Sequence, residues 1–244
     1  MYEYQGLQDV FFIMLYGMAG LFALLACIYL LFRRGNAFVG DEITSSLVLR
    51  RWTAAFMAAI VASHVWWYVI GIYWLADDRL VRNITTILLD HITLVPLVMA
   101  VLLAMLQDRR RSLWPWLLAQ VPEVLAAAVG IASRSEFWGY QVVHYWQLGV
   151  IAVFVVYYIM ALRQYGRWLL DNYADLERKE VWQSLVFIIA LLAVYVVYTS
   201  NAGELVREYL SQVITIVIIA FLLWRVETLQ ELETWEETNN ENEI

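Results

Sequence analysis

The chain has 244 residues, of which 62% are hydrophobic and only 16% are charged. A soluble domain of this length has too little interior to hide so much apolar surface, so the composition excludes an ordinary soluble protein and indicates an integral membrane protein. The net charge of −7 arises at one end of the chain, because residues 226–244 contain seven Glu and no Lys or Arg.

Seven apolar segments are long enough to cross a bilayer as helices. Each has roughly 19–27 residues, compared with the ~20 residues that a helix needs to span the hydrocarbon core. We therefore predict an all-α, polytopic bundle of seven transmembrane helices. The segments cover residues 9–32, 50–76, 84–106, 113–133, 138–163, 181–199 and 206–225.

The basic residues indicate which way this bundle faces. When each of the 16 Lys and Arg residues is assigned to its nearest membrane face, twelve fall on the side of the C-terminus and four on the side of the N-terminus. Cytoplasmic loops are enriched in Lys and Arg, so this asymmetry predicts an external N-terminus and a cytoplasmic C-terminus. The four residues on the external side are Arg79, Arg82, Arg134 and Arg207.

The seventh span has no obvious stop signal, because it continues as RVETLQELETWEE without Gly or Pro. We divide the chain into a transmembrane domain, residues 1–225, and a cytoplasmic segment, residues 226–244, in which a helical stalk extends the last span and ends in a disordered acidic tail. Leu229 and Leu232 would form an apolar stripe on this stalk. Together with Arg225 they are candidates for signal relay, whereas an ordinary membrane-protein tail is the alternative.

Ionisable residues lie inside four of the predicted spans. The third span carries Asp90 and His91 side by side, and the other spans contribute His64, Glu123 and His144. A rise of ~1.5 Å per residue places all five roughly 9–18 Å below the outer surface. Ionisable groups at membrane depth are costly and face the interior of a bundle, so this layer is the candidate functional site.

Three interpretations of the layer remain open. It is a closed hydrogen-bond network that fixes helix register, a pocket for a small ligand that opens to the outside, or a metal site. A pocket would also use Trp67, Tyr68, Gln141, Trp146 and Gln147. A zinc ion would be bound by His64, Asp90, His91 and His144, although no two histidines have the spacing of a local metal motif.

Several classes of function are disfavoured by the residues present. A retinal Schiff base needs a lysine within a span, and the only lysine, Lys179, lies in a predicted cytoplasmic loop. No catalytic motif is recognisable, so we do not expect an enzyme. Direct binding of nucleic acid by this chain is not expected either, because its basic residues fringe the membrane and its tail is acidic.

Four segments carry a resemblance to a known family: LLAMLQDRRRSLWPW (102–116), ALRQYGRWLLDNYADLERKEVWQSL (161–185), YTSNAGELVREYL (198–210) and FLLWRVETLQELE (221–233). They resemble the membrane part of multi-helix regulators from Bacteroidetes, in which a seven-helix domain precedes an AraC-type helix-turn-helix or a histidine kinase. The resemblance implies a sensory domain of the bacterial inner membrane that controls transcription. It also implies an output domain that this chain does not contain.

These observations together predict a transmembrane receptor domain that relays a small-molecule or envelope signal to a cytoplasmic output. A homodimer is expected from the predicted stalk and from the pairing that such outputs need. The alternatives are a small-molecule transporter or a metal-binding membrane protein built on the same buried acids and histidines. A polar path to the cytoplasm would favour a transporter, whereas an apolar seal below the layer would favour a receptor.

Overall fold

A computed structural model describes residues 7–33, 45–70, 77–173, 179, 181–199 and 204–232. These residues form helices and no β-strand, which confirms the all-α prediction. The helices are α1 (Leu7–Phe32), α2 (Leu47–Tyr68), α3 (Arg79–Ala104), α4 (Trp114–Leu118), α5 (Val121–Ser133), the π-helix η2 (Phe137–Val142), α6 (Val143–Asn172), α7 (Trp182–Thr199) and α8 (Glu204–Thr228).

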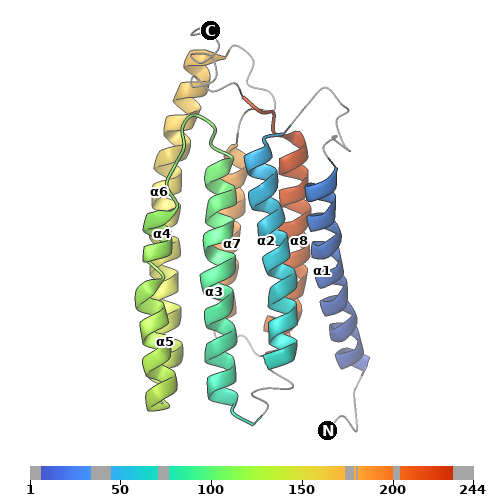
Figure 1. Cartoon of the computed structure of the whole chain (residues 1–244), viewed down its shortest axis with the longest axis vertical. Coiled ribbons are helices and arrows are strands. Elements are labelled where there is room, and N and C mark those ends of the chain that lie inside the picture. Colours follow the sequence, from blue (N-terminus) through green and yellow to red (C-terminus); the bar gives the residue numbers. More distant parts are fainter. Residues whose placement is uncertain are drawn as a thin grey trace.

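The helices lie side by side with their axes close to one direction, and the chain alternates between the two ends of the bundle (Figure 1). We call the end where α1 begins the lower end and the end where α8 finishes the upper end, as they are drawn. Helix α2 contacts α1 and α3, and α1 also contacts α8, whereas α5, η2 and α6 form a second group beside α3. Helix α3 therefore stands between the two groups.

Within the described residues, five helical segments are long and apolar enough to cross a membrane, which supports the prediction of a membrane protein. They are Val10–Phe32, Arg79–Ala104, Trp114–Ser133, Phe137–Asn172 and Tyr209–Thr228. Helix α2 is as long as a span but includes two arginines and a histidine, and much of the side-chain structure of α7 lies outside the described residues. The seven-span topology and the external N-terminus therefore stay predictions.

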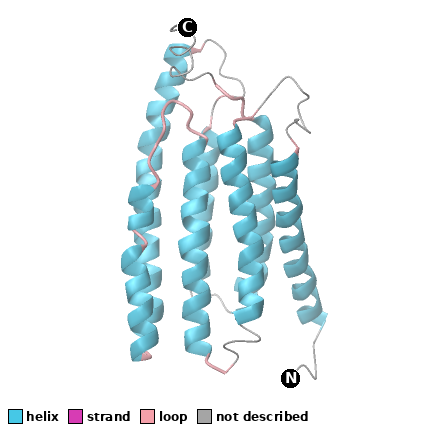
Figure 2. Ribbon diagram, viewed as in Figure 1, coloured by secondary structure: helices cyan, strands magenta, loops and turns pink. Residues whose placement is uncertain are grey.

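The fourth predicted span, residues 113–133, is interrupted in the structure. Helix α4 ends at Leu118 and α5 begins at Val121, with a turn between them that Figure 2 shows as a short loop-coloured segment. Pro122 explains the break, since its nitrogen has no hydrogen to donate to the carbonyl of Leu118. The indole Nε1 of Trp146 on α6 donates to the carbonyl oxygen of Ala119 at 2.8 Å and so satisfies one backbone group at the break.

The predicted helical stalk differs from what the described residues show. Helix α8 ends at Thr228, and the next residues turn back against the bundle, where Leu229 and Leu232 are 1% and 5% exposed. The side chain of Gln107 holds this segment at two points: its Nε2 donates to the carbonyl oxygen of Gln230, and its Oε1 accepts from the nitrogen of Leu232, both at 2.9 Å. Residues 233–244, which comprise the rest of the predicted stalk and the predicted disordered tail (238–244), lie outside the described residues.

The upper end is further fixed by a buried ion pair. Arg50 on α2 and Glu227 on α8 lie 2.8 Å apart and are 4% and 0% exposed. The guanidinium of Arg50 also donates to Ser45 Oγ and to the carbonyl oxygen of Arg33. Arg225, the other predicted relay residue, is buried, with its guanidinium 5.4 Å from the ring of Trp224. The three predicted relay residues thus belong to the packed upper end of the bundle.

Candidate functional site

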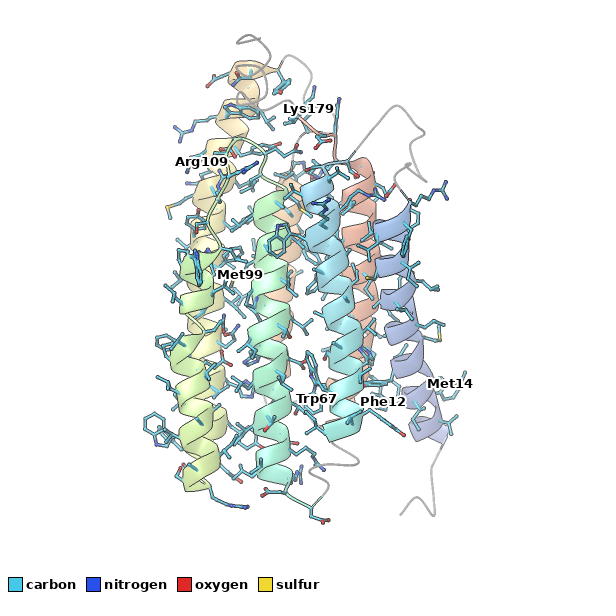
Figure 3. All side chains as sticks on the ribbon, viewed as in Figure 1. Phe12, Met14, Trp67, Met99, Arg109 and Lys179 are labelled. Atoms are coloured by element: carbon cyan, nitrogen blue, oxygen red, sulfur yellow. The ribbon has the colours of Figure 1, made fainter. Side chains whose placement is uncertain are left out.

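Asp90 on α3 faces α2 and accepts three hydrogen bonds from it. Trp66 and Trp67 follow Ser63 by three and four residues, so a helix presents all three on one face. Ser63 Oγ donates at 2.6 Å and Trp66 Nε1 at 3.1 Å to Oδ1, and Trp67 Nε1 donates at 2.7 Å to Oδ2. Figure 3 shows Trp67 in the lower half of the bundle, beside α2 and α3.

The three donors leave the Asp90 carboxylate well satisfied. A buried carboxylate without partners would cost several kcal/mol, and charge-assisted bonds of this kind offset that cost. Because the donors all come from α2, they fix the rotation and register of α2 against α3. The structure therefore favours the closed-network interpretation for Asp90, with Ser63 and Trp66 as participants that the sequence analysis did not single out.

His64 lies next to Ser63 in the sequence but points to the other side of α2. Its Nδ1 donates to the carbonyl oxygen of Ile60 at 2.8 Å, and its Nε2 lies 3.2 Å from Oε1 of Gln212 on α8. The ring of Tyr16 on α1 lies 4.4 Å from the imidazole, and its hydroxyl donates to the carbonyl oxygen of His64 at 2.6 Å. His64 therefore ties α2 to α1 and α8.

His91 turns away from Asp90, because neighbouring residues of a helix point about 100° apart. Its Nδ1 donates to Oε1 of Glu123 on α5, and the Glu123 side chain is completely buried. The ring of His144 on α6 lies 5.8 Å from that of His91 in an edge-on arrangement. The acid–histidine pair and the second histidine thus meet where α3, α5 and α6 come together.

Two buried glutamines lie one helical turn from this pair. Gln120 precedes Glu123 by three residues, so these two side chains share one face of α5 and the turn before it. Gln147 follows His144 by three residues, so these two share one face of α6. The side chain of Gln147 is fully buried and Gln120 is 5% exposed, yet among the described residues neither amide has a hydrogen-bond partner, and Oε2 of Glu123 has none either. Buried polar groups normally find partners, so an unsatisfied group of this kind calls for a bound molecule or water.

The bond from Trp146 to the Ala119 carbonyl indicates that the two glutamines lie at similar depth, because it sets the level of α6 against the α4–α5 break. Gln120 was not among the residues selected from the sequence. A usable signal was present, however: it stands three residues before Glu123 in an apolar span, the spacing that places two side chains on one helix face.

Apolar residues close this α3/α5/α6 site at both ends. Towards the lower end lies a cluster of completely or almost completely buried side chains: Ile84, Ala126, Ala127 and Val143. Towards the upper end, Met99, Trp116, Val150 and Phe154 belong to the main hydrophobic core, and Figure 3 marks Met99 above Trp67. Trp116 and Phe154 meet edge-on with ring centroids 4.9 Å apart.

The predicted layer is therefore divided into two sites and a separate histidine. Asp90 and Trp67 belong to the α2–α3 network, His91, Glu123, His144 and Gln147 to the α3/α5/α6 site, and His64 to the α1/α2/α8 contact. Tyr68 and Gln141, both proposed as pocket residues, lie on the exposed surface. Within the described part of the chain, no three His, Cys, Asp or Glu side chains gather closely enough to hold a metal ion, so the four proposed zinc ligands do not come together.

Comparison with known proteins adds no family to these observations. A scan against protein-family models, a search of curated proteins and a search of solved structures each find no significant match to the chain.

Proposed function

We propose that this chain is a membrane-embedded sensory domain in which the α3/α5/α6 site detects a signal and α3 passes the response to the upper end. The observation that carries the proposal is an acid–histidine pair, with unsatisfied glutamine amides beside it, closed off by apolar residues on the upper side. Such a site is able to bind and respond, whereas a transporter needs a polar route to both faces.

The arrangement of α3 supports a relay. His91 lies about 20 Å from the end of the helix at Ala104. Three residues further on, Gln107 holds the backbone of Gln230 and Leu232, just beyond α8. A signal that binds one arrangement of α3 better than another shifts the population towards that arrangement and changes the position of this segment.

The wider role follows the sequence-based expectation. We place the lower end outside the inner membrane of a bacterium and the upper end in the cytoplasm. The output would be a transcription regulator or a histidine kinase that continues from the upper end, with dimerisation of the membrane domain as a further part of the proposal. In this scheme the chain contacts lipid and its signal but not nucleic acid.

The broken fourth span is the feature that favours a transporter as the second candidate. Interrupted helices with buried polar residues at membrane depth are common at transporter binding sites, where they line a cavity. Here the break lies beside Gln120 and Glu123, so an ion or small molecule bound there is compatible with either function.

Hydrogen–deuterium exchange of the protein in lipid nanodiscs tests the relay. We expect Glu123→Gln, which weakens the pair with His91, to raise deuterium uptake at residues 104–113 and 226–232 as well as near the site. Tyr145→Leu is the matched control, because Tyr145 adjoins His144 in sequence but is 73% exposed. Uptake that changes only around the site would refute the relay, and Glu123-dependent proton uptake into liposomes would support a transporter.

A further inference from the structure

Two shallow grooves flank the broken fourth span on its exposed side. One has a volume of about 300 Å³ and lies beside α3, and the other has a volume of about 280 Å³ and lies beside η2 and α6. The first is lined by Ile92, Leu117, Gln120, Val121, Val124 and Leu125. In a membrane this surface faces the lipid, since the valines and leucines around the groove are exposed.

Among the described residues that line the first groove, Gln120 is the only polar one. Its side-chain oxygen and nitrogen are both buried, and neither has a hydrogen-bond partner in the part of the chain that the structure describes. No water is available in the hydrocarbon region to satisfy them, and each unsatisfied group there costs several kcal/mol. The Gln120 side chain must rotate towards the groove before a bound molecule can reach its amide. The new hydrogen bond then removes the cost, so the amide selects a polar group at a defined depth.

The route into the groove is lateral. Ile84, Ala126, Ala127 and Val143 close the α3/α5/α6 site at its lower side, and the main core closes it at its upper side. A ligand dissolved in the bilayer therefore reaches Gln120 without crossing either cluster. An ordinary phospholipid does not satisfy the amide, because Gln120 lies about 9 Å along the helix from Trp114 and only acyl chain is available at that depth.

The carboxylate of Glu123 restricts which polar head group a ligand in this groove can carry. Glu123 lies one turn from Gln120, and one of its carboxylate oxygens is bonded to His91, whereas the other has no partner among the described residues. An anionic head would be repelled by this carboxylate in a medium of low dielectric constant. A neutral group that both donates and accepts hydrogen bonds complements the Gln120 amide.

We propose that the groove between α3 and the α4–α5 break binds a neutral amphiphile from the bilayer, with an alkyl body and a single hydroxyl or amide head that bonds to Gln120. The inference uses the site of the proposed function but not its relay. Binding without any change at the upper end would overturn only the sensory role, and a relay without binding would overturn only this proposal.

Photoaffinity labelling of the full chain in nanodiscs tests it. The probe is a fatty alcohol with a diazirine in its chain, and the competitors are decanol, decane and decanoate. We expect labelled peptides from residues 92 and 117–125. One hydrogen bond to the amide makes decanol about tenfold more effective than decane as a competitor, and decanoate should be weaker than decanol.

Gln120→Leu keeps the volume of the side chain and removes the amide, whereas Gln141→Leu makes the same change at an exposed site outside both grooves. We expect the preference for decanol over decane to disappear in Gln120→Leu and to persist in Gln141→Leu. Equal competition by decane and decanol in the unaltered protein would mean that ordinary lipid chains fill the groove, and this result would overturn the proposal without any variant. Labelling confined to other helices would overturn it as well.

Discussion

Gly130 on α5 and Gly139 on η2 allow the backbones of these helices to touch. A Cβ atom on Gly130 would lie 2.5 Å from the backbone nitrogen of Gly139 and 2.6 Å from its Cα, distances that real Cβ contacts do not show. Backbone atoms cannot rotate out of the way, so Gly130→Ala must separate the two helices. Overpacking of this kind costs roughly 1–3 kcal/mol, and the better helix propensity of Ala offsets at most about 1 kcal/mol.

Gly139→Ala meets a different obstacle. Its new methyl group would overlap Cδ1 of Ile84 on α3 and lie 2.8 Å from Cγ1, so the clash is with a side chain. Ile84→Val removes the overlapping Cδ1 and alone costs roughly 0.5–1.5 kcal/mol. We therefore expect Ile84→Val to relieve part of the penalty of Gly139→Ala, with a coupling energy of about 0.5 kcal/mol or more. It should give no relief to Gly130→Ala.

The assay is unfolding of the detergent-solubilised protein by sodium dodecyl sulfate, followed by far-UV circular dichroism. Gly149→Ala on α6 is the matched control, since a Cβ there meets nothing within 4 Å. The control should be neutral or gain up to about 1 kcal/mol. Equal midpoints for Gly130→Ala and Gly149→Ala, or rescue of Gly130→Ala by Ile84→Val, would refute the inferred backbone contact.

Two further predictions concern buried polar groups. Trp67→Phe should destabilise the protein more than Trp66→Phe, because the Trp67 hydrogen bond to Asp90 is 2.7 Å long and the Trp66 hydrogen bond is 3.1 Å long. Each bond is worth about 0.6–1.7 kcal/mol. The difference between the two variants should vanish when Asp90→Ala is also present. Glu227→Ala leaves the Arg50 charge buried without its partner and should cost about 3–5 kcal/mol, whereas replacing both residues with apolar ones should recover most of the loss in the same unfolding assay.

The sequence predicted where the helices lie much better than it predicted which side chains contact one another. Long apolar runs predicted the helical segments, and α3 begins at Arg79 instead of residue 84 because Asp78 accepts a bond from the nitrogen of Val81 and caps the helix. The sequence could have predicted that the polar layer divides into separate sites, since adjacent helix positions such as Asp90 and His91 point in different directions. Which helix each of them faces depends on packing, which the sequence does not specify.

The stalk prediction did not hold for residues 229–232 for a related reason. An apolar stripe of Leu229 and Leu232 is equally suited to a projecting helix and to a segment that folds back on the bundle. The choice is made by Gln107, which is more than 120 residues away in the chain. The unsatisfied amide of Gln120 was overlooked although its spacing of three residues from Glu123 was visible, because that spacing predicts a shared helix face but does not show whether the amide finds a partner.

The two sites on α3 constrain each other. Asp90 fixes the helix against α2 through three donors, and the adjacent His91 fixes it against α5 through Glu123. A rotation of α3 that improves one set of bonds therefore strains the other, so intermediate rotations lose bonds on both sides. A second arrangement of α3 would have to change both sets of bonds together, which is the property that the proposed relay needs. A ligand at Gln120 that changes the Glu123–His91 pair would thus act on the α2 contact as well, through one helix and without a separate pathway.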